Sequence, residues 1–181
     1  MINNILKHLK IWRDRLFEIT KSNSRMFSML GQSGSAFGVG LINKAEEKND
    51  IVVLTADMAI PAGLSKFSSL YSDMFYNIGI AEQNLVGIAA GISNEGFRVI
   101  ASAQACFLSM RRYEQVRQYS GYMGLPIIFV GVSSGFALNF FGNTHYALED
   151  VTLMKSIPGM TVISPADGGQ AIKAMDAALN L

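Results

Sequence analysis

The sequence predicts an α/β fold, a doubly wound, mostly parallel sheet with helices on both faces. Short apolar runs rich in β-branched residues alternate with longer segments whose apolar residues recur at helical spacing. Half of the 181 residues are hydrophobic, which is enough for one sizeable core and short for two. Strands separated by helices form βαβ units, and their right-handed crossovers place helices on both faces of a parallel sheet.

The N-terminal segment is predicted to be a helix separate from the sheet. Its apolar residues recur at helical spacing with charged residues between them: Ile5, Leu9, Trp12, Leu16 and Ile19. A polar break follows at residues 21–24. We therefore expect a helical extension over residues 1–24 and the α/β domain over residues 25–181.

The strands and helices of the domain follow in alternation. Five short apolar runs are predicted as strands: residues 51–55, 74–77, 98–102, 127–132 and 161–164. The segments around and between them are predicted as helices: residues 36–48, part of 62–71, 80–93, 107–119, 148–157 and 169–181. The helix over 80–93 carries small residues on several faces, which suits close packing.

Composition excludes several classes of protein. Fifteen basic residues against fourteen acidic ones give a net charge of +1, which argues against a nucleic-acid binder or a polybasic membrane-surface protein. The longest uncharged stretch, residues 118–148, is interrupted by polar residues, and the N-terminus has no uncharged signal-peptide core. One cysteine, Cys106, excludes a disulfide framework, so we expect a reducing, cytoplasmic location. The low charged fraction of 16% indicates surface that is buried against other protein.

Ligands of such sheets bind beyond the carboxyl ends of the strands. Three loops are predicted there: residues 56–63, 103–106 and 133–146. The last is long for a compact domain, and long loops often carry function.

Glu82 has two open interpretations. A carboxylate in the first turn of a helix is favoured by the helix dipole and needs no catalytic role. Glu82 is also the only acid between Asp73 and Glu95. Among such apolar neighbours, a carboxyl group can exchange protons with a ligand.

The other candidates are open in the same way. His145, in the long loop, is either structural or catalytic. Asp57 follows a strand, where an Asp commonly shapes a turn. Phe107 by itself indicates core, and Cys106 a small buried hydrophobe. A final group is predicted to form a solvated or interface face of one helix: Arg111, Arg112 and Arg117.

These residues and their neighbours resemble the pyrimidine-binding domain of transketolases, which use thiamine diphosphate. The segment from Gly79 to Gly91 is similar to the family's G-I-x-E-Q/H helix. Five further segments resemble family motifs in the same order, from about Gly34 to Leu181: residues 113–117, 142–145, 148–150, 157–160 and 164–167.

The resemblance implies a role for each candidate. Glu82 matches the glutamate that hydrogen-bonds the aminopyrimidine and promotes the imino tautomer, which removes the thiazolium proton. Phe107 resembles the aromatic packed on the pyrimidine. Met58 resembles the large apolar residue that holds the cofactor bent, and Asp57 the acid beside it. His145 resembles a histidine near the donor sugar's hydroxyls. Glu82 and His145 are therefore the catalytic candidates.

Three departures from the family pattern bear on the substrate. Gln104 stands where a second aromatic is usual, and Phe141 stands where sugar-phosphate transketolases carry an Asp that reads a hydroxyl. Gly34 lies near the place of a phosphate-binding Arg. We therefore expect a less usual acceptor, such as a non-phosphorylated or nucleotide-linked sugar.

The resemblance also implies partners. Transketolases bind the diphosphate and Mg²⁺ through a Gly-Asp-Gly…Asn motif in another domain, and this chain has no Gly-Asp-Gly. We expect a split transketolase: this pyrimidine-binding subunit and a diphosphate-binding subunit, two of each about a two-fold axis, moving a two-carbon ketol unit between sugars or sugar phosphates. The alternatives are a half of another thiamine diphosphate enzyme, like deoxyxylulose-phosphate synthase or a ketoacid dehydrogenase β subunit, and a non-catalytic regulatory partner.

Overall fold

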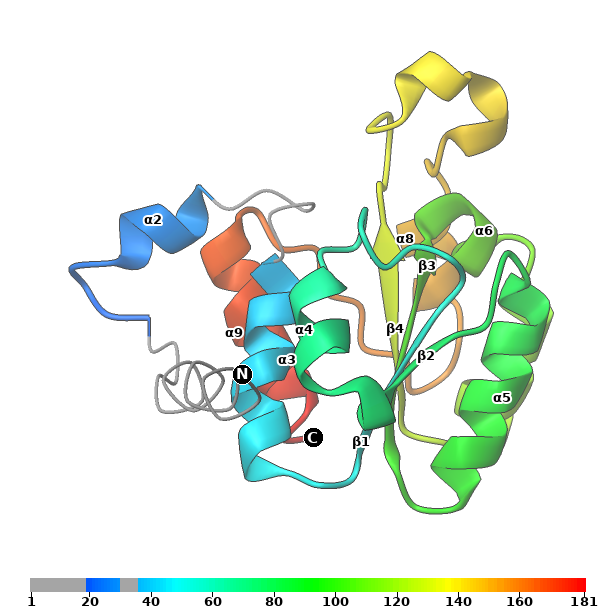
Figure 1. The fold of residues 1–181 in the computed structure, drawn as a ribbon. Coiled ribbons are helices and arrows are strands. Elements are labelled where there is room, and N and C mark those ends of the chain that lie inside the picture. The colour runs from blue at the N-terminus through cyan, green and yellow to red at the C-terminus, as the bar shows by residue number, and fades with distance from the viewer. Residues whose placement is uncertain (1–18, 30–35) are drawn as a thin grey trace.

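Four parallel strands form the centre of the molecule (Figure 1). The computed structural model describes residues 19–29 and 36–181. Within them the strands lie in the order β2-β1-β3-β4 and comprise β1 (Ile51–Thr55), β2 (Phe75–Asn77), β3 (Arg98–Gln104) and β4 (Ile127–Val132). All three pairings are parallel, with Val53 opposite both Phe75 and Ile100. The predicted fold class is confirmed.

Helices cover both faces of the sheet (Figure 1). One face carries α3 (Ala36–Glu47), α4 (Ser65–Leu70) and α9 (Gly168–Ala178). The other carries α5 (Glu82–Asn94), α6 (Ala105–Ser109), α7 (Tyr113–Val116), the π-helical turn η2 (Arg117–Tyr122) and α8 (Asp150–Lys155). Shorter elements are α2 (Ser24–Ser28), η1 (Ser72–Met74), η3 (Asn139–Phe141) and η4 (Asn143–His145). No helix among the described residues has the length and apolar character needed to cross a membrane.

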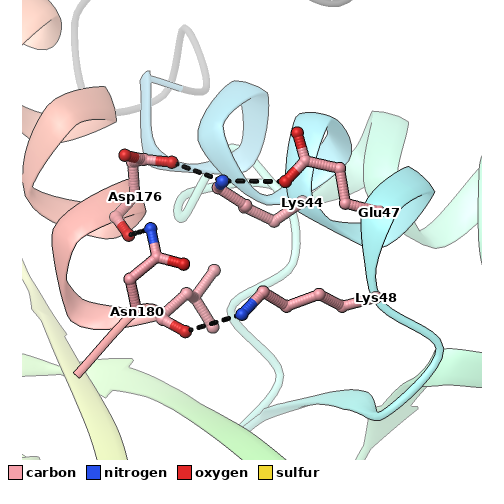
Figure 2. Close-up of polar contacts among 6 residues, drawn as sticks. Lys44, Glu47, Lys48, Asp176 and Asn180 are labelled. Atoms are coloured by element: carbon pink, nitrogen blue, oxygen red, sulfur yellow. Dashed lines mark hydrogen bonds and ion pairs between the residues drawn. The ribbon is translucent and has the colours of Figure 1, made fainter.

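The α3–α9 face holds a core, and an ion pair and a hydrogen bond join these two helices. Leu41, Phe67 and Ile100 are fully buried in this core. At its rim, Lys44 Nζ lies 2.7 Å from an Asp176 carboxylate oxygen on α9 and 2.8 Å from Glu47 (Figure 2). Lys48 Nζ donates to the carbonyl of Leu179 at 3.2 Å. These bonds hold α3 and α9 side by side.

The opposite face has its own core between the sheet and α5. Leu85, Val86 and Ala89 are fully buried and pack on sheet residues such as Val99 and Ala101. These three residues of α5 lie at helical spacing, so one face of the helix meets the sheet. The packing fixes the start of α5 near the carboxyl ends of the strands, where Glu82 begins the helix.

Two element predictions are wrong. The helix over 107–119 is broken into α6, α7 and η2, with a turn at residues 110–112 that has neither Pro nor Gly. The break brings the Arg112 guanidinium to within 3.6 Å of Glu82 on α5, a contact that local helix propensity does not reveal. Residues 161–164 join no strand of the described chain. Pro158 and Pro165 flank that segment, and proline cannot donate to a strand ladder.

The predicted N-terminal extension falls mostly outside the described residues. Of the part described, α2 begins at Ser24, and Phe27 is buried against Val39 and Ile172. The division of the chain at residues 24–25 stays a prediction.

Candidate active site

The carboxyl ends of all four strands meet at one edge of the sheet because the strands are parallel. The segments after β1 and β4 are loops, as predicted. The predicted loop at 103–106 is wrong, because β3 continues through Gln104 and α6 begins at Ala105. Gly131 on β4 allows this tight connection, since an added Cβ would lie 3.2 Å from the Ala105 Cβ.

Asp57 and Asn77 tie together the ends of β1 and β2. Asn77 Oδ1 accepts hydrogen bonds from the backbone N–H groups of Asp57 and Gly79, both at 3.0 Å. Its amide donates to the Asp57 carboxylate at 2.9 Å. Asp57 has φ of 55°, in the left-handed region where Asp is tolerated. Asn77 was not among the predicted site residues, although its place at the end of a strand was a usable signal.

Met58 lies beside Asp57 and faces the α3–α4 core. Its backbone N–H donates to Thr55 Oγ1 at 3.2 Å, and its side chain packs against that core. Met58 is thus held from one side by β1 and from the other by buried apolar residues.

Glu82 is a buried carboxylate with two arginines beside it. It opens α5 and is 6% exposed. Its Oε2 lies 3.6 Å from Arg111 Nη1 and 3.6 Å from Arg112 Nη2. The first turn of a helix also favours a negative charge. The sequence indicated the helix terminus but not the arginines, because their approach depends on the broken helix.

The two arginines differ in their surroundings. The Arg111 side chain is 53% exposed, and its guanidinium lies over the Phe107 ring, 4.1 Å from the ring centroid. The Arg112 side chain is fully buried. Burial lowers the pKa of Arg112, and the Glu82 carboxylate opposes that shift. The predicted solvated or interface face is wrong for Arg112, because its side chain is buried within the domain.

Aromatic rings continue the site from Phe107 to the long loop. The Phe107 ring meets the His145 ring edge-on, with centroids 5.3 Å apart. The Phe141 ring stacks on the His145 ring with centroids 4.8 Å apart, and Phe140 packs on Phe141 at 4.4 Å. His145 Nδ1 is hydrogen-bonded to Thr144 Oγ1 at 2.9 Å.

The long loop stands away from the body of the domain (Figure 1). Its base is closed by paired backbone hydrogen bonds between Gly135 and Ala147, each 3.0 Å. Ser134 also donates to the Asp150 carboxylate. Above this base, Phe140 and Phe141 are exposed. The loop therefore presents aromatic side chains next to His145.

Two buried residues complete this region. Gln104 ends β3 and is 7% exposed, and its Nε2 has no hydrogen-bond partner among residues 19–29 and 36–181. Cys106 is fully buried, and burial raises the pKa of its thiol, which confirms its interpretation as a small apolar residue.

The structure thus brings three predicted residues into one string of contacts. Arg111 links Glu82 to Phe107, and Phe107 contacts His145. Asp57 and Met58 lie on the β1 side of the same edge. Together these features define a doubly wound α/β domain with a site at its carboxyl edge, built from a buried glutamate, two arginines and an aromatic wall.

Comparison with known proteins gives the family. Residues 32–181 match the family described as "Transketolase, pyrimidine binding domain", and the chain belongs to that family. It is 35% identical over 133 residues to one subunit of the apulose-4-phosphate transketolase of Phocaeicola vulgatus, covering 74% of this chain and 43% of the relative. It is 31% identical over 145 residues to 1-deoxy-D-xylulose-5-phosphate synthase of Syntrophomonas wolfei, covering 80% of this chain and 22% of the relative.

A solved structure agrees with both the fold and the family. A split gene transketolase, described as an inactive beta4 tetramer, superposes with a TM-score of 0.72 and 35% identity, covering 82% of this chain and 48% of that one. The chain spans less than half the length of each of these three relatives.

Proposed function

We propose that this chain is the pyrimidine-binding subunit of a thiamine diphosphate-dependent, transketolase-like transferase. The enzyme transfers a two-carbon ketol unit between sugars. One observation carries the proposal: the Glu82 carboxylate is buried at the carboxyl edge of the sheet, and Arg111 joins it to the Phe107 ring. Bound thiamine diphosphate supplies a carbon nucleophile that the protein side chains lack.

The residues present fit the pyrimidine half of the cofactor. An aminopyrimidine offers a flat ring and polar ring nitrogens, and this edge offers an aromatic face and a carboxylate. With the cofactor bound, Phe107 would pack on the ring, and Glu82 would hydrogen-bond a ring nitrogen and exchange a proton with it. Met58 and Asp57 border the site from β1. His145, held between Phe107 and Phe141, binds the hydroxyls of the sugar donor.

We propose that a second polypeptide completes the site by binding the diphosphate and Mg²⁺. Apolar side chains stand exposed after β1, after β2 and on the long loop: Ile60 at 76%, Ile80 at 81% and Phe140 at 74%. Such side chains are more stable when covered, and ligand pockets often form at domain interfaces. The proposed assembly is a cytoplasmic heterotetramer with two copies of each chain about a two-fold axis.

The proposed acceptor is unlike the common pentose phosphates. Residues 118–148, which include the whole long loop, carry no Asp, Glu, Lys or Arg. Beside His145 the loop presents Phe140 and Phe141 instead. A non-phosphorylated or nucleotide-linked sugar suits that surface. Equal kcat/KM for ribose 5-phosphate and for such sugars would contradict this part of the proposal.

A second candidate keeps the cofactor and changes the reaction. The likeness to 1-deoxy-D-xylulose-5-phosphate synthase favours a pyruvate-dependent condensation. The donor distinguishes the two candidates. A ketose donor that supports turnover while pyruvate does not would favour ketol transfer, and the reverse would favour the condensation.

The proposal is tested by isolating the chain from its source cells with thiamine diphosphate and Mg²⁺ present, and identifying co-purifying proteins by mass. We expect a partner of equal abundance that bears Gly-Asp-Gly…Asn, and a complex that transfers ketol units. A chain that emerges alone and binds no cofactor would favour the non-catalytic alternative.

A further inference from the structure

Among the residues that the structure describes, Arg112 is the largest side chain that is completely buried. It lies in the turn between α6 and α7, as the residue that precedes Tyr113. If residues 107–119 formed the single helix that was predicted, this turn would be absent. The turn places a guanidinium at the N-terminus of α5, where Glu82 begins the helix.

Few hydrogen bonds compensate this burial. Nη2 donates to the carbonyl of Phe107 at 3.3 Å and lies 3.6 Å from Glu82 Oε2. Nε and Nη1 are buried and have no acceptor among the described residues. A guanidinium carries five N–H donors, and each buried donor without an acceptor costs stability. Burial accordingly lowers the pKa of Arg112.

Arg112 depends on Glu82 for charge compensation more than Glu82 depends on Arg112. Glu82 is the one carboxylate that pairs with Arg112 among the described residues, and Arg111 adds a like charge. Glu82 has two further supports, which are Arg111 and the helix N-terminus. Removing Glu82 therefore leaves Arg112 buried without a carboxylate, whereas removing Arg112 leaves the charge of Glu82 compensated by Arg111 and the helix N-terminus.

We propose that Arg112 is a positioning residue, which fixes the Glu82 carboxylate at the start of α5 so that it points to the site. Its burial does not stabilise the fold, because a buried ion pair with incomplete hydrogen bonding is commonly no better than an apolar pair. Arg111 cannot replace it, since that side chain is half in solvent and lies over Phe107. The functional half of this inference rests on the proposed function.

Thermal unfolding of the full chain without cofactor tests the charge coupling. Glu82→Gln leaves Arg112 buried without a carboxylate, so we expect the Tm to fall by about 5–15 °C. Arg112→Met should lower the Tm by less than about a third of that, and the double variant should recover most of the loss. A fall for Arg112→Met as large as that for Glu82→Gln would overturn the inference, because Arg112 would then anchor the fold. A Glu82→Gln variant as stable as the wild type would overturn it too.

Cofactor measurements on the two-chain complex test the positioning role. For Arg112→Met we expect thiamine diphosphate to bind about tenfold more weakly, and exchange of the thiazolium C2 hydrogen for deuterium to slow by about 10- to 100-fold. KM for the sugar should not change, and Arg112→Lys should recover part of both losses. Arg117→Met, at an exposed arginine that belongs to none of these contacts, is the matched control and should leave C2 exchange unchanged.

The outcomes separate this inference from the proposed function. Wild-type affinity and wild-type exchange in Arg112→Met would overturn the positioning role. A wild-type complex that binds no thiamine diphosphate would overturn the proposed function, while the thermal cycle would still measure the coupling between Glu82 and Arg112.

Discussion

Two cationic side chains on opposite faces of the sheet use their charge in contrasting ways. Lys44 lies at the rim of the α3–α9 face, and its Nζ is within 2.8 Å of two carboxylates (Figure 2). Its hydrogen bond to Asp176, and secondarily its hydrogen bond to Glu47, raises the pKa of Lys44. Arg112, on the α5 side, has one carboxylate at 3.6 Å, and burial lowers its pKa.

This contrast indicates that the α3–α9 face serves stability and that the α5 side serves the site. The α3–α9 face pairs its charges well and joins two helices, as expected of a stabilising contact. The α5 side leaves guanidinium nitrogens without acceptors next to the carboxylate that opens the helix. Polar groups that are poorly satisfied in a fold are concentrated at functional sites. Substitutions should accordingly affect activity on one face and stability on the other.

The largest expected effect is on activity. Glu82→Gln keeps the shape and removes the carboxylate that exchanges a proton with the cofactor, so ketol transfer by the complex should fall about 10²- to 10⁴-fold. Asp176→Asn on the other face and Glu95→Gln at the far end of α5 are matched controls that should keep their activity. Steady-state rates at saturating cofactor measure the difference, and a fully active Glu82→Gln complex would refute the catalytic assignment.

The next effect is on stability. Phe67 is fully buried in the α3–α4 core, so Phe67→Ala should lower the free energy of unfolding by about 3–5 kcal/mol. Denaturant titration of the chain measures this loss. The protein that remains folded should keep its specific activity in the complex. A Phe67→Ala variant that stays stable but loses activity would contradict the assignment of stability to this face and activity to the other.

A smaller effect is expected at Lys44. Lys44→Met should cost about 0.2–1 kcal/mol, less at high salt, because the pair lies near the surface. The folded pKa of Lys44 is raised above its ordinary 10.5, so the pair stabilises fully below that value and is lost as pH rises through the folded pKa. Unfolding of wild type and variant at pH 8 and pH 11 should show the difference shrinking. A constant difference would contradict the assigned ion pair.

The smallest expected effect concerns the Cys106 thiol, which should be unreactive in the folded chain. The pKa of the Cys106 thiol is raised by burial, so the folded chain should react negligibly with a disulfide reagent at pH 8. The reaction should become fast in denaturant. The raised pKa also means that stability falls as the pH rises above the ordinary thiol value, because the unfolded chain loses its proton first. Rapid labelling of the native chain would show that the α6 region opens.

The fold was predictable because its periodicities are strong. The run from Ile127 to Val132 is a strand with the predicted bounds, and α3 and α5 begin and end within two residues of the prediction. Gln104 extends β3 beyond its prediction, since pairing with Val132 decides where the strand ends. Partners across a sheet are not visible in local sequence.

The site was predictable only in part. The position of Glu82 followed from the helix start, and the resemblance selected Phe107 and His145. The burial of Arg112 did not follow, because no Pro or Gly marks the turn after α6 and its partner Glu82 lies on another element, α5. Asn77 was missed in the same way, since two of its three hydrogen bonds reach Asp57, which follows the neighbouring strand.

The decisive measurement is calorimetric titration of thiamine diphosphate with Mg²⁺ into the co-purified complex, as wild type and as Glu82→Gln. We expect saturable binding by the wild-type complex, weaker binding by Glu82→Gln, and none by this chain alone. Equal binding by wild type and Glu82→Gln would contradict the assignment of Glu82 to the cofactor. Full-strength binding by the isolated chain would contradict a site shared between two polypeptides.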